Sequence, residues 1–154
     1  MLSASSSSRP GAIINLVGAA IIVIGFFLPM FMQSNPQLPG SIHPIYEWQA
    51  VQISTNTIVT VLFGLGAALP LLAMLIILGT SVAALFRTQI QPPGLILLKR
   101  IAAIVGLVLQ LLFQTIIYLL SQIGYARTDI SWGFIVMPIG FLVLVISVFF
   151  VEPH

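Results

Sequence analysis

The sequence predicts an all-α polytopic membrane protein, a bundle of four transmembrane helices with both termini in the cytoplasm. Of its 154 residues, 59% are hydrophobic and only 5% are charged, whereas a soluble domain carries about 25% charged residues. Its eight charges leave four uncharged apolar runs, each long enough to span a hydrocarbon core that takes roughly 20 helical residues to cross. The basic residues are unevenly shared between the connecting segments, which predicts the orientation.

The apolar runs are expected to be helices, because lipid-exposed backbone must satisfy its own hydrogen bonds and the alternation of a membrane strand is absent. The first run is longer than a signal-peptide core and no cleavage site follows it, so we expect it to be retained. We expect a flexible cytoplasmic tail at 1–10, a transmembrane domain at 11–151 and a C-terminal tail at 152–154. The expected spans are about 11–32, 57–86, 101–123 and 133–151, with an outer loop at 33–56.

The second span, at 57–86, has 30 residues, which at about 1.5 Å per residue is roughly 45 Å of straight helix. A helix of that length must tilt, kink or protrude from the bilayer. Pro70 in its interior removes one backbone donor and its ring clashes with the preceding turn. We therefore expect a kink just before Pro70.

Lysine and arginine predict the orientation in the plasma (inner) membrane. Arg9 lies in the N-terminal tail, and Arg87, Lys99 and Arg100 lie between the second and third spans, whereas the opposite loops hold only Arg127. Positive charge concentrates in cytoplasmic loops, so the first four residues are the predicted topology anchors. We expect the three in the loop to lie at anionic lipid headgroups.

Small residues recur every seven positions in the first and fourth spans, which keeps them on one face of each helix. Close backbone approach at small residues is what packs helices together in lipid. The sequence leaves open whether the two faces meet each other or a different protein. The predicted helix-packing residues are Gly11, Gly18, Gly25, Gly133, Gly140 and Ser147.

The third span carries the most polar face within the predicted spans, with Gln110, Gln114 and Tyr118 at helical spacing. An unpaired amide is costly in an apolar environment, so these side chains are expected to point into the bundle or at a partner. One interpretation is interhelical hydrogen bonding, typically worth about 0.6 kcal/mol; the alternative is a polar lining for a permeation path. The spans contain no ionisable residue, which disfavours a self-contained pump or secondary transporter.

The sequence predicts neither an enzyme nor a metal site. His43 in the outer loop and His154 at the C-terminus are predicted on opposite sides of the membrane, so they cannot share a metal within one chain. A solvated loop residue is the favoured interpretation of His43, and ligation of a pigment or metal by His43 alone is the alternative. Glu47 and Asp129 are two exposed carboxylates in different outer loops, without the burial that separates the pKa values of an acid-base pair. Catalytic and phosphate-binding motifs are absent, as is cysteine. No cofactor is predicted; a bound lipid or pigment is left open.

The Gly25-Phe-Phe-Leu-Pro29 end of the first span, followed by an outer loop and three further spans, resembles small four-span bacterial membrane proteins of unassigned role. Claudin-like and tetraspanin-like proteins also have four spans and a longer first outer loop. This chain lacks the loop cysteines of both, so neither family implies a fold or a site residue here.

The leading functional hypothesis is a non-catalytic membrane subunit that packs within a larger complex, with its glycine faces and outer loop as contact surfaces. An outer loop of this length is more often functional or partner-bound than idle. The expected partners are membrane lipids and other integral membrane subunits or copies of itself; five basic residues are too few for a nucleic-acid interface. The first alternative is a pore or transporter component that uses the polar face of the third span. The second is a membrane-embedded enzyme or lipid-handling subunit.

Overall fold

The computed structural model describes residues 8–34, 38, 40–50, 57–86, 93–122 and 127–151. Arg87, His154 and the predicted C-terminal tail lie outside these residues, as does most of the predicted N-terminal tail. The remainder of that tail, from Ser8, already belongs to the first helix.

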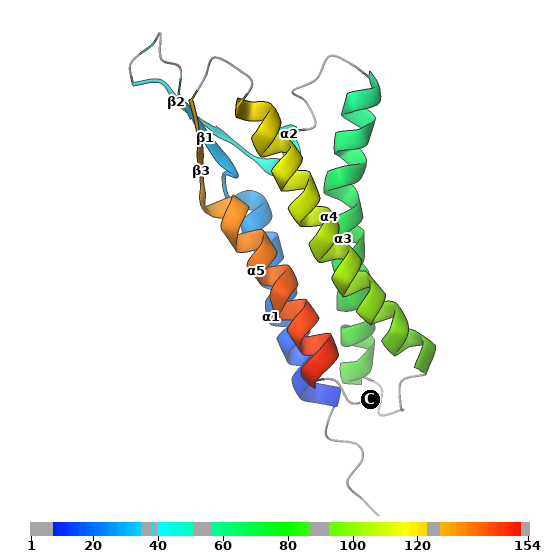
Figure 1. Ribbon diagram of the computed structural model, residues 1–154. Helices are drawn as coiled ribbons and strands as arrows, with labels where there is room; N and C mark the ends of the chain where they lie inside the picture. The colour runs from blue at the N-terminus through cyan, green and yellow to red at the C-terminus, as the bar shows by residue number, and fades with distance from the viewer. Residues whose placement is uncertain are drawn as a thin grey trace, which may run out of the picture.

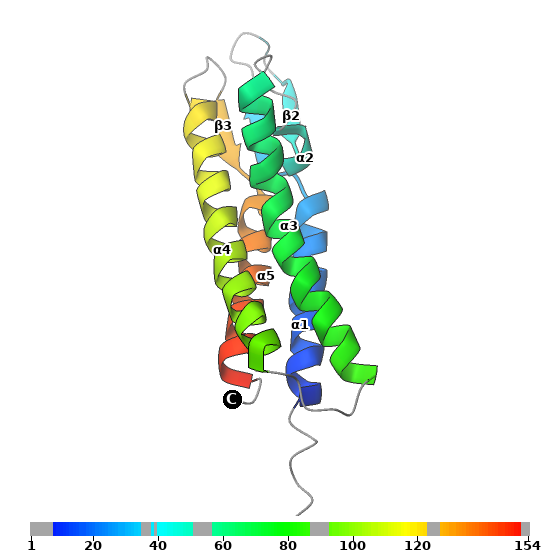
Figure 2. The ribbon, with the colours of Figure 1, turned by 90° about the vertical axis from the view of Figure 1, so that its right-hand side faces the viewer.

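Long helices make up most of the described chain. They are α1 (Ser8–Phe27), α3 (Thr57–Phe86), α4 (Pro93–Gln122) and α5 (Trp132–Ile146), which continues as the π-helical segment η1 (Ser147–Val151). They lie side by side as a bundle, and α1 begins at the end of the bundle where η1 ends (Figures 1 and 2). Four segments within these ranges are long and apolar enough to cross a membrane: Arg9–Phe27, Gly64–Phe86, Pro93–Gln122 and Trp132–Val151. The prediction of four such helices is confirmed.

Two helix ends differ from the predicted spans. The helix α1 ends at Phe27 rather than near residue 32, because the chain turns at Pro29, where Leu28 N–H donates to Gly25 O at 3.1 Å, and then becomes extended. The helix α4 begins at Pro93 rather than at 101. Proline suits the first turn of a helix, where its missing N–H has no partner to lose. Part of the predicted cytoplasmic loop is therefore helical.

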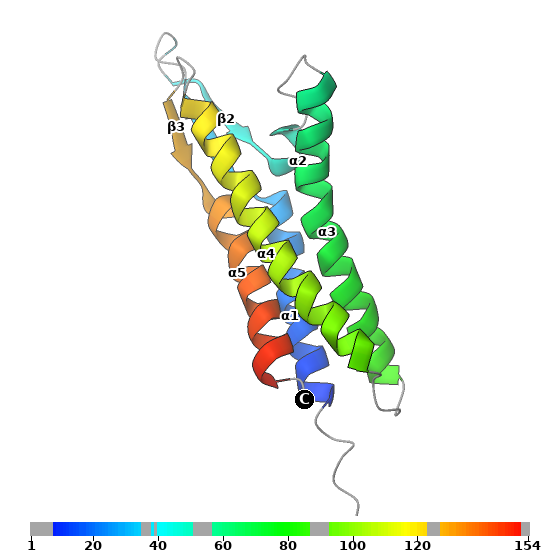
Figure 3. The same ribbon diagram turned by 45° about the vertical axis from the view of Figure 1, so that its right-hand side comes forward.

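A small antiparallel sheet lies at the end of the bundle opposite the start of α1, beyond α1 and α5 and beside α4 (Figures 1 and 3). Its strands are β1 (Phe31–Ser34), β2 (Ile42–Ile45) and β3 (Arg127–Ile130), in the order β2-β1-β3. The short helix α2 (Glu47–Ala50) follows β2. An all-α protein was predicted, so the sheet is a correction. Its strands have four residues each, too few for a clear alternation of apolar and polar residues, and β1 pairs with a strand from the far end of the chain.

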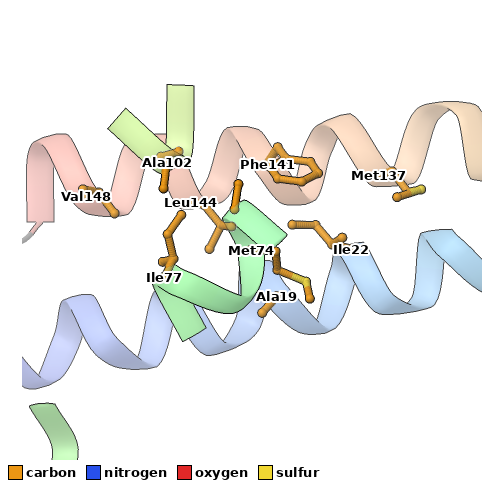
Figure 4. Packing of buried hydrophobic residues seen from close by; sticks show 11 residues of the cluster. Ala19, Ile22, Met74, Ile77, Ala102, Met137, Phe141, Leu144 and Val148 are labelled. Atoms are coloured by element: carbon orange, nitrogen blue, oxygen red, sulfur yellow. The ribbon is translucent and has the colours of Figure 1, made fainter. Parts of the chain in front are cut away.

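Two apolar clusters hold the bundle together. The larger one joins α1, α3, α4 and α5 and includes Ile22, Ile77 and Phe141, all at 0% exposure (Figure 4). The smaller one lies toward the sheet, where the rings of Phe31 and Tyr118 stack with their centroids 6.0 Å apart. Between helices in lipid, cohesion depends on such close packing because the hydrophobic effect of water is missing.

Candidate functional site

The small residues of α1 and α5 face each other along one antiparallel seam. The Ser147 hydroxyl donates to Gly11 O at 3.0 Å. A Cβ added to Gly18 would lie 3.1 Å from Gly140 O, and one added to Gly140 would lie 2.9 Å from Gly18 O. Of the two alternatives that the sequence left open, the structure therefore has the two faces in contact within one chain.

The same seam continues to the ends of the two helices that lie next to the sheet. A Cβ on Gly25 would lie 2.9 Å from the backbone nitrogen of Met137. One on Gly133 would lie 2.6 Å from Leu28 O and 2.9 Å from Pro29 O, and Gly133 N–H donates to Pro29 O at 2.9 Å. Every residue of the predicted helix-packing set thus contacts another part of the same chain. None of these small-residue faces is left free for a partner protein.

The polar face predicted on the third span lies on α4 and points into the bundle. Gln110 and Gln114 are both fully buried, one helical turn apart, which places their Cβ atoms about 5–6 Å from each other. Tyr118, the third residue of the set, is half-buried and stacks instead on Phe31, the first residue of β1. The structure therefore keeps the two glutamines together and places the tyrosine in the apolar cluster.

An acidic residue joins the glutamines, and the sequence analysis missed it. Glu47, the first residue of α2, is 1% exposed, and the Gln110 amide nitrogen donates to Glu47 Oε2 at 3.0 Å. The Met137 sulfur lies 3.7 Å from the same nitrogen. The expectation that Glu47 and Asp129 are both exposed loop carboxylates is wrong for Glu47, although Asp129 is exposed on β3.

One signal in the sequence pointed to this residue. Glu47 is the only charged residue between Arg9 and Arg87, and it is flanked by Tyr46 and Trp48. A single acid in a long and otherwise uncharged stretch between two spans is a candidate for burial against those spans. Its partner on α4 was not visible, because the two residues are 63 positions apart.

Several polar atoms in this cluster have no hydrogen-bond partner among the described residues: Glu47 Oε1, Gln110 Oε1 and both polar side-chain atoms of Gln114. Buried polar groups are nearly always paired, and an exception calls for an explanation. Each unpaired group costs about 1–3 kcal/mol. We name Glu47, Gln110 and Gln114 the outer polar cluster, after the outer loop that was predicted from the sequence and that contains Glu47.

Burial also changes the acidity of Glu47, which lies outside the four spans. Desolvation raises its pKa from 4.5 to about 7, while the hydrogen bond from Gln110 acts in the opposite direction and is the smaller effect. The carboxyl group therefore changes its charge near neutral pH, where an exposed glutamate stays ionised.

The predicted topology anchors occupy different environments. Arg9 is exposed at the start of α1, and Arg100 is half-buried with its Cζ 5.4 Å from the centre of the Phe149 ring. Lys99, expected at the lipid headgroups, is fully buried inside the bundle. The reason is that α4 begins before this residue and turns its side chain onto the buried face of the helix. Arg87 lies outside the described residues.

An apolar layer separates the outer polar cluster from polar groups nearer the other end. There, Asn15 Nδ2 donates to Ser81 Oγ at 2.9 Å, in a fully buried contact. Between the two levels, Gly106 packs against Phe141, whose Cε1 would lie 2.7 Å from an added Cβ, and against Ala73. The polar groups therefore form two levels with close apolar packing between them.

Other sites in the described part of the chain offer little chemistry. No group of three His, Cys, Asp or Glu side chains there is placed to hold a metal ion, and His43 is exposed on β2. An open surface hollow of about 300 Å³ lies between β3 and the start of α5, lined by Ile130, Ser131, Trp132 and Ile135. The outer polar cluster is thus the best candidate for a functional site.

No protein-family model, curated protein or solved structure matches the chain. The proposals below therefore rest on the chemistry and geometry of the site.

Proposed function

We propose that this protein is a non-catalytic pore or transporter component of the plasma (inner) membrane, and that the outer polar cluster binds the transported species. The observation that carries the proposal is the buried hydrogen bond between Glu47 and Gln110, with unpaired oxygens beside it. Ionisable groups inside membrane bundles are costly, and they usually mark ion or substrate pathways.

This proposal reverses the order of the hypotheses that the sequence favoured. A transporter was disfavoured because the spans contain no acid, but α2 brings Glu47 to Gln110 from an outer connection. The assembly hypothesis was motivated by glycine faces, and those faces are occupied between α1 and α5. The geometry therefore supports a polar binding site better than an unused packing surface.

A role as a subunit within a larger membrane complex stays a second candidate, supported by the outer sheet. In the order β2-β1-β3, the strands β2 and β3 each have one edge without a neighbouring strand in this sheet. Open strand edges can accept a strand from another chain. β2 contains Pro44, which has no backbone N–H to donate to an added strand. β3 is therefore the better edge for such pairing.

Reconstitution in liposomes separates the two candidates. We expect ion currents on solid-supported membranes after jumps in pH, NaCl or KCl, and a loss of about tenfold when Gln110 and Gln114 are both replaced by leucine, because removing hydrogen bonds worth about 1–3 kcal/mol weakens the site. Val108→Leu, on the exposed face of α4, is the matched control and should keep the wild-type current. Currents unchanged in the double variant would refute the proposal. Inactive liposomes together with a partner that co-purifies in mild detergent would favour the subunit role.

We also propose that α1 begins and η1 ends on the cytoplasmic side, and that α3 bends before Pro70. The positive-inside rule and the missing N–H of Pro70 support these two details. The chain has no cysteine, so single cysteines can report sidedness. In intact cells, an impermeant thiol reagent should label Ile42→Cys on the sheet and should label Gly94→Cys at the start of α4 only after permeabilisation. The reverse pattern would contradict this orientation.

A further inference from the structure

The hydrogen-bonding groups of the outer polar cluster are unbalanced when Glu47 is ionised. An ionised carboxylate and an amide oxygen only accept hydrogen bonds. The unpaired atoms are then three acceptors, namely Glu47 Oε1, Gln110 Oε1 and Gln114 Oε1, and one donor group, Gln114 Nε2. The site therefore has more acceptors than donors.

A single proton restores the balance. When it binds to Glu47 Oε1, a new O–H bond forms, no other covalent bond breaks, and that oxygen becomes a donor while Oε2 still accepts from Gln110 Nε2. The unpaired groups then comprise two acceptors and two donors. The amide oxygens of Gln110 and Gln114, on successive turns of α4, are the unpaired acceptors of the cluster.

Among the described residues, the helices packed around the cluster carry their cations far from Gln110 along the helix axes. Within their described ranges, α3 and α5 carry no charged residue, and α1 carries only Arg9 at its opposite end. On α4, Arg100 lies ten residues before Gln110, about 15 Å along the helix axis, and Lys99 is farther still. The titratable groups near the pair in sequence are Tyr46 and the exposed His43 before Glu47, and Tyr118 two turns beyond Gln110; Asp129 is exposed on β3. A buried carboxylate without a countercharge favours its neutral form.

The connection of α2 to the sheet points to the side from which a proton arrives. Glu47 directly follows β2 and Tyr46, in the outer connection between α1 and α3. On the other side of the cluster, Gly106 and Phe141 pack closely in the apolar layer. This arrangement favours proton access from the compartment that contains the sheet.

We propose that the outer polar cluster is a proton-binding site, in which Glu47 carries the proton and its protonation holds α2 against α4. This inference rests on the proposed function, because it names the ion that the transporter would couple to. The raised pKa of Glu47, at about 7, agrees with it, since proton occupancy would then change within the physiological range.

Infrared titration of the full-length protein in liposomes tests this proposal without any transport measurement. We expect a protonated carboxyl band that disappears with a midpoint near neutral pH, is absent in Glu47→Gln and persists in Asp129→Asn, which removes the exposed acid of the sheet. Glu47→Gln mimics the protonated acid, so it should fold, as circular dichroism would show. Gln110→Leu should raise the midpoint, because it removes the donor to the carboxylate.

The outcomes separate the proton site from the proposed function. A wild-type midpoint near that of an exposed glutamate, or a band that survives in Glu47→Gln, would overturn the proton site. So would a midpoint that shifts when sodium replaces choline at constant ionic strength, because a metal cation would then be the ligand. A neutral midpoint in a protein that carries no current would keep the proton site and refute the transport role.

Discussion

Replacing Gly140 with leucine is expected to lower the stability of the bundle strongly, because the added side chain would force α1 and α5 apart. A Cβ at this position would already lie 2.9 Å from Gly18 O and 2.9 Å from the backbone nitrogen of Ile22. Backbone atoms cannot move aside as side chains can, so the helices must separate. Overpacking costs about 1–3 kcal/mol where side chains can adjust, and we expect about 3 kcal/mol or more here.

The measurement is thermal unfolding in detergent, followed by circular dichroism. A loss of about 3 kcal/mol lowers the Tm of a protein of this size by roughly 10 °C. Gly79→Leu is the matched control, because nothing lies within 4 Å of its added Cβ, and leucine favours a helix over glycine by close to 1 kcal/mol. Equal Tm values for the two variants would show that α1 and α5 do not meet at Gly140.

Replacing Gln110 with leucine is expected to cost about 2–3 kcal/mol above pH 7, because an ionised and buried Glu47 then loses its donor. The loss should be smaller near pH 5, where Glu47 is protonated. Replacing Glu47 and Gln110 together with leucine should restore most of the stability, since removing both partners of a buried pair is far less harmful than removing one. A double-mutant cycle of unfolding free energies at both pH values measures this coupling.

The wild-type protein should also show the pH dependence that the raised pKa of Glu47 implies. Between pH 4.5, its unperturbed pKa, and about pH 7, the folded state binds more protons at this residue than the unfolded state. The contribution of Glu47 to stability is therefore fully present below pH 4.5, is lost as the pH rises to about 7 and is level above that. The control is Gln49→Leu, which removes the amide oxygen of α2 that accepts from Tyr46 N–H. This variant should keep the pH dependence of the unfolding free energy, and the Glu47 variants should lose it. In the double-mutant cycle, additive effects of the Glu47 and Gln110 replacements on the unfolding free energy would contradict their pairing.

The two levels of buried polar groups give the bundle an asymmetric interior. The outer level contains one acid on a short helix between two spans, and the other level contains the Asn15–Ser81 contact within the spans. An acid on a short connecting segment can move at lower energetic cost than one within a long packed helix, because fewer contacts have to break. Because α2 is short and lies between two spans, we expect the proposed proton-dependent movement to occur at α2.

The sequence was sufficient to predict properties that depend on local spacing and composition. Four apolar runs predict four helices, because a span must satisfy its own backbone hydrogen bonds in lipid. The seven-residue spacing of Gly18 and Gly25 on α1 predicts a packing face, and the spacing of Gln110 and Gln114 predicts a buried polar stripe. Each of these follows from one helix considered alone.

Only the tertiary structure decided which faces meet and where the acid lies. Gly18 and Gly140 are far apart in sequence, and small residues pack equally well against another chain, so spacing alone does not select the partner. The pairing of β1 with β3 joins distant segments whose four-residue strands are too short to show a pattern. That sheet and the turn at Pro29 set the position of α2, and thereby bring Glu47 to Gln110. Such long-range contacts depend on the packing of all four helices, which no single stretch of sequence encodes.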